Sequence, residues 1–262
     1  MLPTFHHPVH GPIKLGKKAP RIDKRTLKLA KYLKGGLPAA PAEVSWITKV
    51  PQPWNMFLND KLGDCVLAAC GHMIMQWSFF AGSPFVPSDD QILTAYEAVG
   101  GYDPGNPNTD NGADMLTALN YWRQTGVAGH KILAFASVDW TNRDEMRAAI
   151  QIFGNVYLGV QLPLSAQGKP LWTVADGGIY TSGGEPGSWG GHCIPVMAES
   201  PETDSVITWG GITKMSHNFL TDYADEAFAV LSPEWLAANG QSPSGLDLDQ
   251  LNQDLAQLPS AA

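Results

Sequence analysis

The sequence predicts an α+β protein, with helical segments in the first half of the chain and strands in the second. An apolar run begins at Cys65, and its apolar residues recur at spacings of three and four, which is typical of a helix. These residues are Val66, Ala69, Met73, Trp77 and Phe80. Far downstream, His192 heads the apolar segment 193–197, which has the composition of a buried strand. A second helix start follows the first run, because Ser88 and Gln91 have the spacing of a capping box.

The position of Cys65 at a predicted helix start suggests that it is a nucleophilic thiol. The free N–H groups and the dipole of a helix N-terminus stabilise a thiolate, which is the nucleophilic form of cysteine. Asp64 is the expected N-cap, and its negative charge would oppose ionisation. We therefore expect His192 to supply the cation of a thiolate–imidazolium pair. The alternative is that Cys65 is a small buried apolar residue, which is the interpretation we give to Cys70 in the same run.

The residues around both sites occur in a wider pattern. Residues 44–50 hold Val, Trp and Lys elements, residues 59–65 lead to Cys65, and residues 88–93 begin a helix. Further elements are the segments 112–126 and 146–160, the strand 178–180, His192 before an apolar strand, and Trp209-Gly210. In this order, from about residue 37 to about 232, the chain resembles the papain-like cysteine peptidases. It is similar to divergent members from bacteriophages and bacteria. The separation of Cys65 and His192, 127 residues, is close to the spacing of that family.

The resemblance implies a two-part architecture. A helical half, residues 37–125, would pack against a β-barrel-like half, residues 126–232. Residues 1–36 would form a basic N-terminal arm and residues 233–262 a C-terminal tail. A cleft would run between the halves, a common place for active sites. The residues that would line it are Gly63, Asp64, Trp189, Gly191 and Trp209.

The resemblance also implies roles. Cys65 would be the nucleophile, His192 the general base and acid, and Asn59 an oxyanion donor together with the Cys65 backbone N–H. Asn59 stands where the family has Gln, so its amide is one methylene closer to the backbone. The family orients its His with an Asn two residues before the Trp. That position is Ile207 here, and Thr208 could offer a hydroxyl instead if the strand register slips by one.

These departures leave two functions open. The chain is either a cysteine hydrolase acting on peptide or protein substrates, or a catalytically degenerate papain-like protein with a structural or assembly role, such as a phage virion component. Retention of Cys65 and His192 favours chemistry, whereas the missing orienting Asn favours a scaffold.

Composition and local motifs argue against several other classes of protein. No apolar run of 18 residues occurs, and the N-terminus has no basic segment followed by an apolar core, so we expect neither a transmembrane segment nor a signal peptide. Three cysteines in 262 residues suit a reducing compartment, so we expect a cytoplasmic or virion-associated protein. We expect no cofactor, because neither a phosphate-binding loop nor a dinucleotide fingerprint is present. We expect no metal, because Cys65 and Cys70 would not share a helix face.

Charge is divided unevenly along the chain. Residues 1–34 hold nine basic residues and one acid, a net charge of +8, whereas the remaining chain carries −16. A basic arm contacts nucleic acid or an acidic surface. The nearest acidic surface is the body of the same chain or of a neighbouring copy. We therefore expect docking within the chain or homo-oligomer contacts through residues 1–34, rather than a nucleic-acid partner.

Overall fold

A computed structural model of the chain describes residues 2–33, 41–239 and 246–257. The expected boundary between arm and body, at residues 36 and 37, lies outside them. In chain order the strands are β1 (Thr4–His7), β2 (Gly11–Lys14), β3 (Leu27–Lys28), β4 (Val44–Ser45), β5 (Ala134–Ser137), β6 (Val156–Leu162), β7 (Leu171–Trp172), β8 (Gly190–Glu199), β9 (Thr203–Thr208), β10 (Gly211–Ser216) and β11 (Ala224–Leu231). The α-helices are α1 (Cys65–Phe80), α2 (Asp89–Gly100), α3 (Met115–Gln124), α4 (Arg143–Phe153), α5 (His217–Tyr223), α6 (Pro233–Asn239) and α7 (Leu248–Gln257). Among the described residues, short 3₁₀ turns form at Leu29–Tyr32, Pro107–Thr109 and Leu164–Ala166.

The structure confirms the α+β class. Within the described residues, nine strands form one sheet in the order β3-β5-β11-β6-β8-β9-β10-β7, with β4 paired to β8. Most pairs are antiparallel, and the two parallel ones, β3 with β5 and β10 with β7, lie at the ends of this order. The order starts at β3 and ends at β7 without returning, so the β half is an open sheet rather than a closed barrel in the part of the chain described here.

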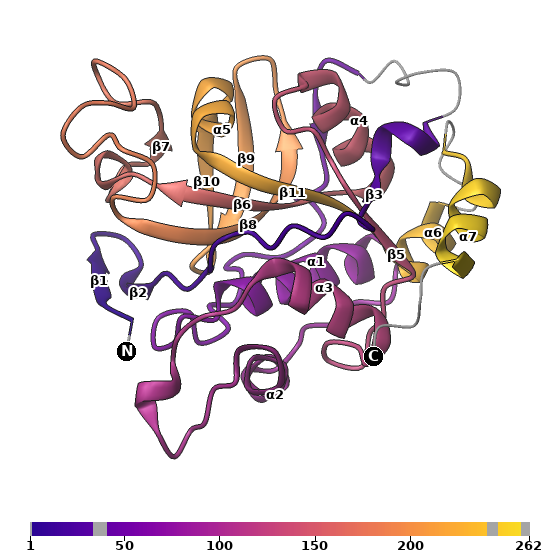
Figure 1. The fold of residues 1–262 in the computed structure, drawn as a ribbon, viewed down its shortest axis with the longest axis horizontal. Helices are drawn as coiled ribbons and strands as arrows, with labels where there is room; N and C mark the ends of the chain where they lie inside the picture. Colours follow the sequence, from indigo (N-terminus) through magenta and orange to yellow (C-terminus); the bar gives the residue numbers. More distant parts are fainter. Residues whose placement is uncertain (1, 34–40, 240–245, 258–262) are drawn as a thin grey trace.

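Helices cover the sheet on both faces. Figure 1 shows α1, α2 and α3 below the sheet and α4 and α5 above it. Successive residues of a strand point to opposite faces of the sheet, so alternate side chains pack into two separate cores, one on each face. In β8, Cys193 and Met197 join the core around α1, whereas Ile194 and Val196 join the core beneath α4 and α5.

Helix α1 is the centre of the lower layer. The sequence predicts one apolar stripe along it, but nearly every residue of this helix is buried, because β8 and the helices α2, α3 and α6 surround it. Helix α6, from the C-terminal part of the chain, packs against α1 and contributes the buried Trp235. The ring centroids of Trp235 and Trp46 are 4.9 Å apart. Residues 233–239 are therefore part of the packed body. The capping box predicted at Ser88 is confirmed, with both of its hydrogen bonds formed.

The N-terminal arm threads through the molecule. In Figure 1 its indigo trace runs from the β1–β2 hairpin, between the sheet above and α1 and α3 below, to β3 at the far side. Ile13, Leu15, Leu29 and Tyr32 are buried in the core beneath α4 and α5. The arm thus contributes a strand, β3, and core side chains to the body.

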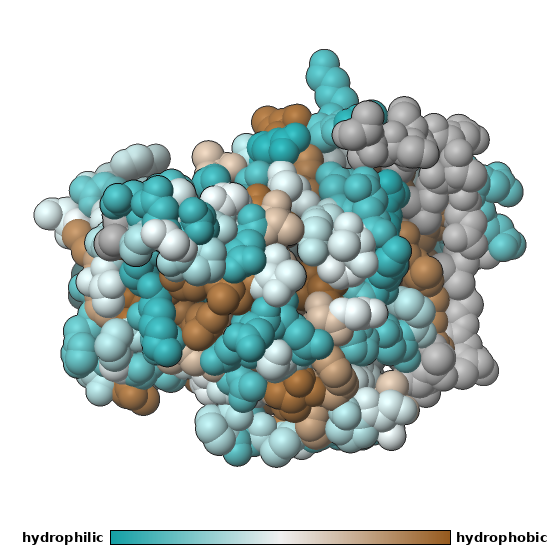
Figure 2. Space-filling view, turned by 90° about the horizontal axis from the view of Figure 1, so that it is seen from below, coloured by the Kyte–Doolittle hydropathy of each residue, from teal (hydrophilic) through white to brown (hydrophobic). Residues whose placement is uncertain are grey.

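The face of the molecule on the side of α2 is mostly polar. The face in Figure 2, seen from below relative to Figure 1, is largely teal and white, with apolar side chains gathered in several separate brown areas. Among the described residues no helix has the length and the apolar character needed to cross a lipid bilayer.

Candidate active site

Cys65 stands at the first position of α1, as the sequence predicts, and it is buried. Asp64 occupies the N-cap position, but its side chain accepts no cap hydrogen bond. Both of its carboxyl oxygens are buried and have no hydrogen-bond partner among the described residues. Burial raises the pKa of Asp64 well above its usual value, which favours the uncharged acid. The expected negative charge beside the thiol is therefore largely absent.

His192 lies on β8 and is also buried. Its Nε2 lies 2.7 Å from the hydroxyl oxygen of Thr208, and its ring stacks on the indole of Trp209 with centroids 4.6 Å apart and planes 19° from parallel. Its Nδ1 has no hydrogen-bond partner among the described residues, so no hydrogen bond joins the imidazole to the Cys65 sulfur here.

Thr208, rather than Ile207, is the residue in contact with the histidine. Ile207 points to the opposite face of β9 and is packed in the core around α1. The alternation of a strand explains this, since neighbouring residues face opposite sides. A hydroxyl can both donate and accept, so Thr208 orients the ring without fixing one tautomer as strictly as an amide oxygen would.

Trp209 is held in place by an unusual turn. Trp209 and Gly210 form the two-residue connection between β9 and β10, and both have positive φ, 47° and 73°. This is the pattern of a type I′ hairpin turn, in which a bulky residue such as Trp is rare. We interpret the strain at Trp209 as a consequence of placing its ring over His192.

Burial favours the neutral form of both Cys65 and His192. Burial raises the pKa of Cys65 to about 12, although the N–H groups of Cys193 and Gly16 and the charge of Lys17 oppose the shift. Burial lowers the pKa of His192 to about 3, with a smaller contribution from His72. With the arm in place, burial therefore disfavours the expected thiolate–imidazolium pair, and the pair remains a prediction.

The arm is what shields the site. The Lys14 N–H donates to the Asn59 carbonyl at 2.8 Å, and the Lys14 carbonyl accepts from Asn59 Nδ2 at 3.2 Å and from Trp209 Nε1 at 3.4 Å. Asn59 Nδ2 also donates to the Leu62 carbonyl. The predicted oxyanion donor thus already binds a peptide carbonyl of the arm.

Gly16 and Lys17 continue along the same path. Lys17 N–H donates to the Gly191 carbonyl at 3.1 Å, and the Gly16 carbonyl accepts from Ala113 N–H at 2.9 Å. The contact is very close, because a Cβ built on Gly16 would lie 1.8 Å from the Gly63 carbonyl oxygen. Beside Cys65, an extended segment of the arm is therefore hydrogen-bonded to Ala113 on one side and to Gly191 on the other.

The arm contacts four of the five residues predicted to line the cleft. Gly63 packs on Gly16, Gly191 binds Lys17, and Trp209 binds the Lys14 carbonyl. Trp189 is largely buried and meets the ring of Phe5 edge-on at 5.7 Å. The fifth, Asp64, is buried.

Sequence reasoning missed Asp110 and the acids on β11. The Lys14 ammonium is 2.7 Å from Asp110 Oδ2, and Asp110 Oδ1 accepts from Gly63 N–H and Tyr96. Lys17 pairs with Asp225 and Glu226. The charge imbalance pointed to docking on the body, but no local pattern identified these acids. Assembly contacts through the arm remain a prediction.

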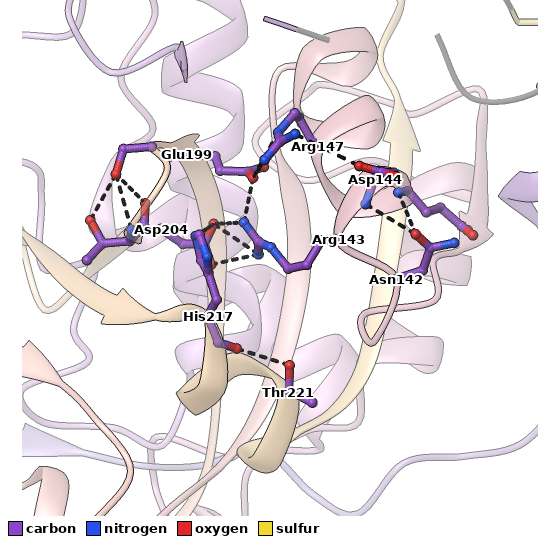
Figure 3. Close-up of polar contacts among 11 residues, drawn as sticks. Asn142, Arg143, Asp144, Arg147, Glu199, Asp204, His217 and Thr221 are labelled. Carbon is purple, nitrogen blue, oxygen red and sulfur yellow. Dashed lines mark hydrogen bonds and ion pairs between the residues drawn. The ribbon is translucent and has the colours of Figure 1, made fainter. Parts of the chain in front are cut away.

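One group of side chains has the composition of a metal site. Ligand atoms of Glu199, Asp204 and His217 lie within 4.8 Å of one another. Figure 3 shows Arg143 and Arg147 directed at the two carboxylates, with Arg143 pairing to both and Arg147 Nη2 lying 2.9 Å from Glu199 Oε1. Two guanidinium groups balance two carboxylates, so we interpret this as an ion-pair network that ties α4 to the end of β8 and the start of β9.

Comparison with solved structures identifies proteins of similar fold. Xylellain, a cysteine protease from Xylella fastidiosa, superposes with a TM-score of 0.66 at 15% identity, over 83% of this chain and 96% of that one. Procathepsin B of Trypanosoma congolense gives 0.57 at 11% identity, over 82% and 86%. The cysteine protease and lectin-like domains of Cwp84 from Clostridium difficile give 0.53 at 12% identity, over 78% and 57%. No protein-family model matches the sequence, and no curated protein sequence matches it significantly.

Proposed function

We propose that this protein, which has the papain-like fold, is a cysteine peptidase whose own N-terminal arm keeps it latent. The observation that carries the proposal is the extended arm beside Cys65, hydrogen-bonded through its backbone to Asn59, Ala113 and Gly191. A site that binds main-chain N–H and C=O groups of one extended segment is suited to bind another.

The residues present suit acyl transfer from a peptide bond. His192 Nδ1, which has no hydrogen-bond partner among the described residues, would take the Cys65 proton, and the thiolate would add to the substrate carbonyl carbon. The oxyanion would form near Asn59 Nδ2 and the Cys65 N–H. The C–N bond would break as His192 returns the proton to the leaving amine. Water would then add to the thioester, give a proton to His192, and release the carboxylic acid and the free thiol.

Thr208 would act as a positioning residue. Its hydroxyl can accept from the Nε2–H of His192, which leaves Nδ1 unprotonated and able to take the thiol proton. Trp209 covers this contact from one side. The imidazole of this chain is thus oriented without an amide.

The test uses the full chain with the arm displaced. Gly16→Val adds side-chain atoms where a Cβ alone would collide with Gly63, so the arm should leave the cleft. Ala19→Val, at an exposed arm residue, is the matched control. We expect Gly16→Val to cleave members of a broad peptide panel, and we expect no cleavage when Cys65→Ala is added. A folded Gly16→Val protein with an open cleft and no Cys65-dependent cleavage would favour a non-catalytic scaffold.

A further inference from the structure

A recess beside Cys65 binds the side chain of Lys17. The backbone of Lys17 is fixed between the two walls, by Gly191 on one side and by the Ala113 contacts of its neighbours on the other. Its side chain is fully buried, with the ammonium 2.9 Å from Asp225 Oδ2 and 3.0 Å from Glu226 Oε1. A burial of this kind is rare for lysine unless the charge is paired.

The recess has the shape of a lysine side chain because of one glycine. A Cβ built on Gly159, in β6, would lie 2.1 Å from Lys17 Cε and 2.7 Å from Asp225 Oδ1. Any larger residue at position 159 would fill the space that the aliphatic stem occupies. The floor of the recess is therefore open to a long, unbranched side chain.

A bulge in β11 supplies two acids at the end of the recess. Successive residues of a regular strand point to opposite faces. Ala224 pairs with Val160 and Glu226 with Gly159, so Asp225 is an extra residue in the ladder. A bulge of this kind redirects a side chain, which lets both Asp225 and Glu226 reach one ammonium group.

The recess belongs to the body and not to the arm. Gly159 and Gln161 lie on β6 and the two acids on β11, and Gln161 Nε2 holds Asp225 Oδ2 at 2.6 Å. Asp225 Oδ1 has no hydrogen-bond partner among the described residues, so an acceptor remains for a second donor. Burial also raises the pKa of Glu226, with the Lys17 charge opposing it. Two largely buried carboxylates need a cation whenever the arm is absent.

We propose that the recess formed by Gly159, Gln161, Asp225 and Glu226 is a specificity subsite for a lysine or arginine side chain of the substrate, close to the bond that Cys65 attacks. This proposal rests on the peptidase function proposed above. The arm occupies the subsite with Lys17 as a substrate would. Cleavage of a substrate should therefore require a basic residue at this position, and displacement of Lys17 by that residue should help to open the cleft.

The first experiment measures binding, which does not depend on catalysis. A labelled peptide with the sequence of residues 13–19 is titrated into full-length Gly16→Val protein, beside a peptide with norleucine at the Lys17 position. Norleucine keeps the aliphatic stem and lacks the charge. We expect it to bind at least about tenfold more weakly, because it leaves two buried carboxylates unpaired. The difference should disappear when Asp225→Asn and Glu226→Gln are combined, and persist in Asp222→Asn, which removes an exposed charge nearby.

The second experiment measures cleavage of peptides that differ only in lysine, arginine or norleucine at that position. We expect kcat/KM to favour the basic residues by at least about tenfold and the ratio to fall toward one in the doubly neutralised recess. Equal binding of the lysine and norleucine peptides would overturn the subsite, whatever the cleavage result. Lysine-selective binding without any cleavage would retain the subsite and reject the peptidase function. If Gly16→Val does not fold, Lys17→Gln replaces it, since it removes the charge that anchors the arm.

Discussion

The candidate active site around Cys65 and His192 and the ion-pair network of Arg143, Arg147, Glu199 and Asp204 are both buried polar clusters, but their polar groups are paired to different extents. In the network, the carboxylates of Glu199 and Asp204 each meet a guanidinium group, although Glu199 Oε2 has no hydrogen-bond partner among the described residues. In the active site, the Asp64 carboxyl and His192 Nδ1 have no hydrogen-bond partner among the described residues, and the thiol and imidazole are both held uncharged. Unpaired buried groups are costly, whereas matched ones fix the structure.

The difference indicates what each cluster is for. The network joins α4 to β8 and β9, and its charges are already balanced, so we assign it to stability. In the candidate active site, the Asp64 carboxyl and His192 Nδ1 lack hydrogen-bond partners among the described residues. Unsatisfied and perturbed groups gathered in a cleft are typical of functional sites. Variants of the two clusters should therefore fail in different assays.

The largest effect should come from displacing the arm. In Gly16→Val we expect Cys65 to alkylate about 1000-fold faster at neutral pH, because its pKa would return from about 12 toward the ordinary value near 8.5. Cys70 and Cys193 should remain unreactive, since both are buried in the body. Iodoacetamide labelling with peptide mapping measures this, and Ala19→Val should match the parent protein. Similar rates for all three cysteines would show unfolding rather than opening of the cleft.

The next effect concerns the network alone. Glu199→Gln should lower the free energy of unfolding by about 3 kcal/mol, at the lower end of the range for buried ion pairs, because its guanidinium partners are about a quarter exposed. Urea denaturation measures the loss, and Glu202→Gln, at an exposed acid nearby, is the control. Cys65 labelling in the arm-displaced background should not change. A lower labelling rate without loss of stability would mean that the two clusters are coupled.

A smaller effect is expected at the histidine. In the arm-displaced background, Thr208→Val should reduce kcat about tenfold, a fraction of what a positioned acid–base group contributes. Thr208→Ser should restore the rate and the pH profile, because the hydroxyl is what contacts Nε2. An unchanged kcat in Thr208→Val, or a loss in Thr208→Ser as large as in Thr208→Val, would reject the positioning role.

Ile207→Asn is the matched comparison for Thr208. The family alignment favours position 207 for an orienting amide, but this side chain faces the α1 core and away from the His192 contact. The variant should lose about 1–3 kcal/mol of stability for an unsatisfied amide and gain no activity. A gain in kcat would show that β9 can shift its register.

The smallest effect is a pH dependence of stability. Burial raises the pKa of Asp204 to about 6, with the Arg143 charge opposing the shift, whereas the unfolded value is near 3.9. The folded state then holds the proton more tightly, so this contribution is present below about pH 4 and is lost as the pH rises through about 6. Thermal melts of the parent and Asp204→Asn across this range should diverge in slope. Parallel curves would contradict the shift.

Local sequence patterns predicted the helix that begins at Cys65 and the strand that carries His192 better than the contacts around these two residues. Cys65 at a helix start and His192 on a strand followed from local pattern, and both are placed as expected. The Thr208 contact was left open, because strand register cannot be read to one residue. The path of the arm depended on contacts between Gly16, Lys17 and residues about 50 to 210 positions away, which leave no periodic signal.

The sequence did not identify Asp225 and Glu226 as the partners of Lys17 for a similar reason. Asp225 and Glu226 look like ordinary charges in an amphipathic strand, and only the bulge in β11 turns both toward Lys17. The segment 101–113 likewise contains Asp110, Gly112 and Ala113, which are buried where the arm crosses them. Cytoplasmic or virion location stays a prediction.

The most direct test of the central claim uses a peptidyl electrophile that carries a lysine, added to full-length Gly16→Val protein, with and without His192→Ala. The adduct is mapped by mass spectrometry. If Cys65 is the nucleophile and His192 its base, the adduct should form on Cys65 alone and at least about tenfold more slowly without the histidine. An adduct that forms equally fast without His192, or that appears on Cys70 or Cys193, would contradict the account.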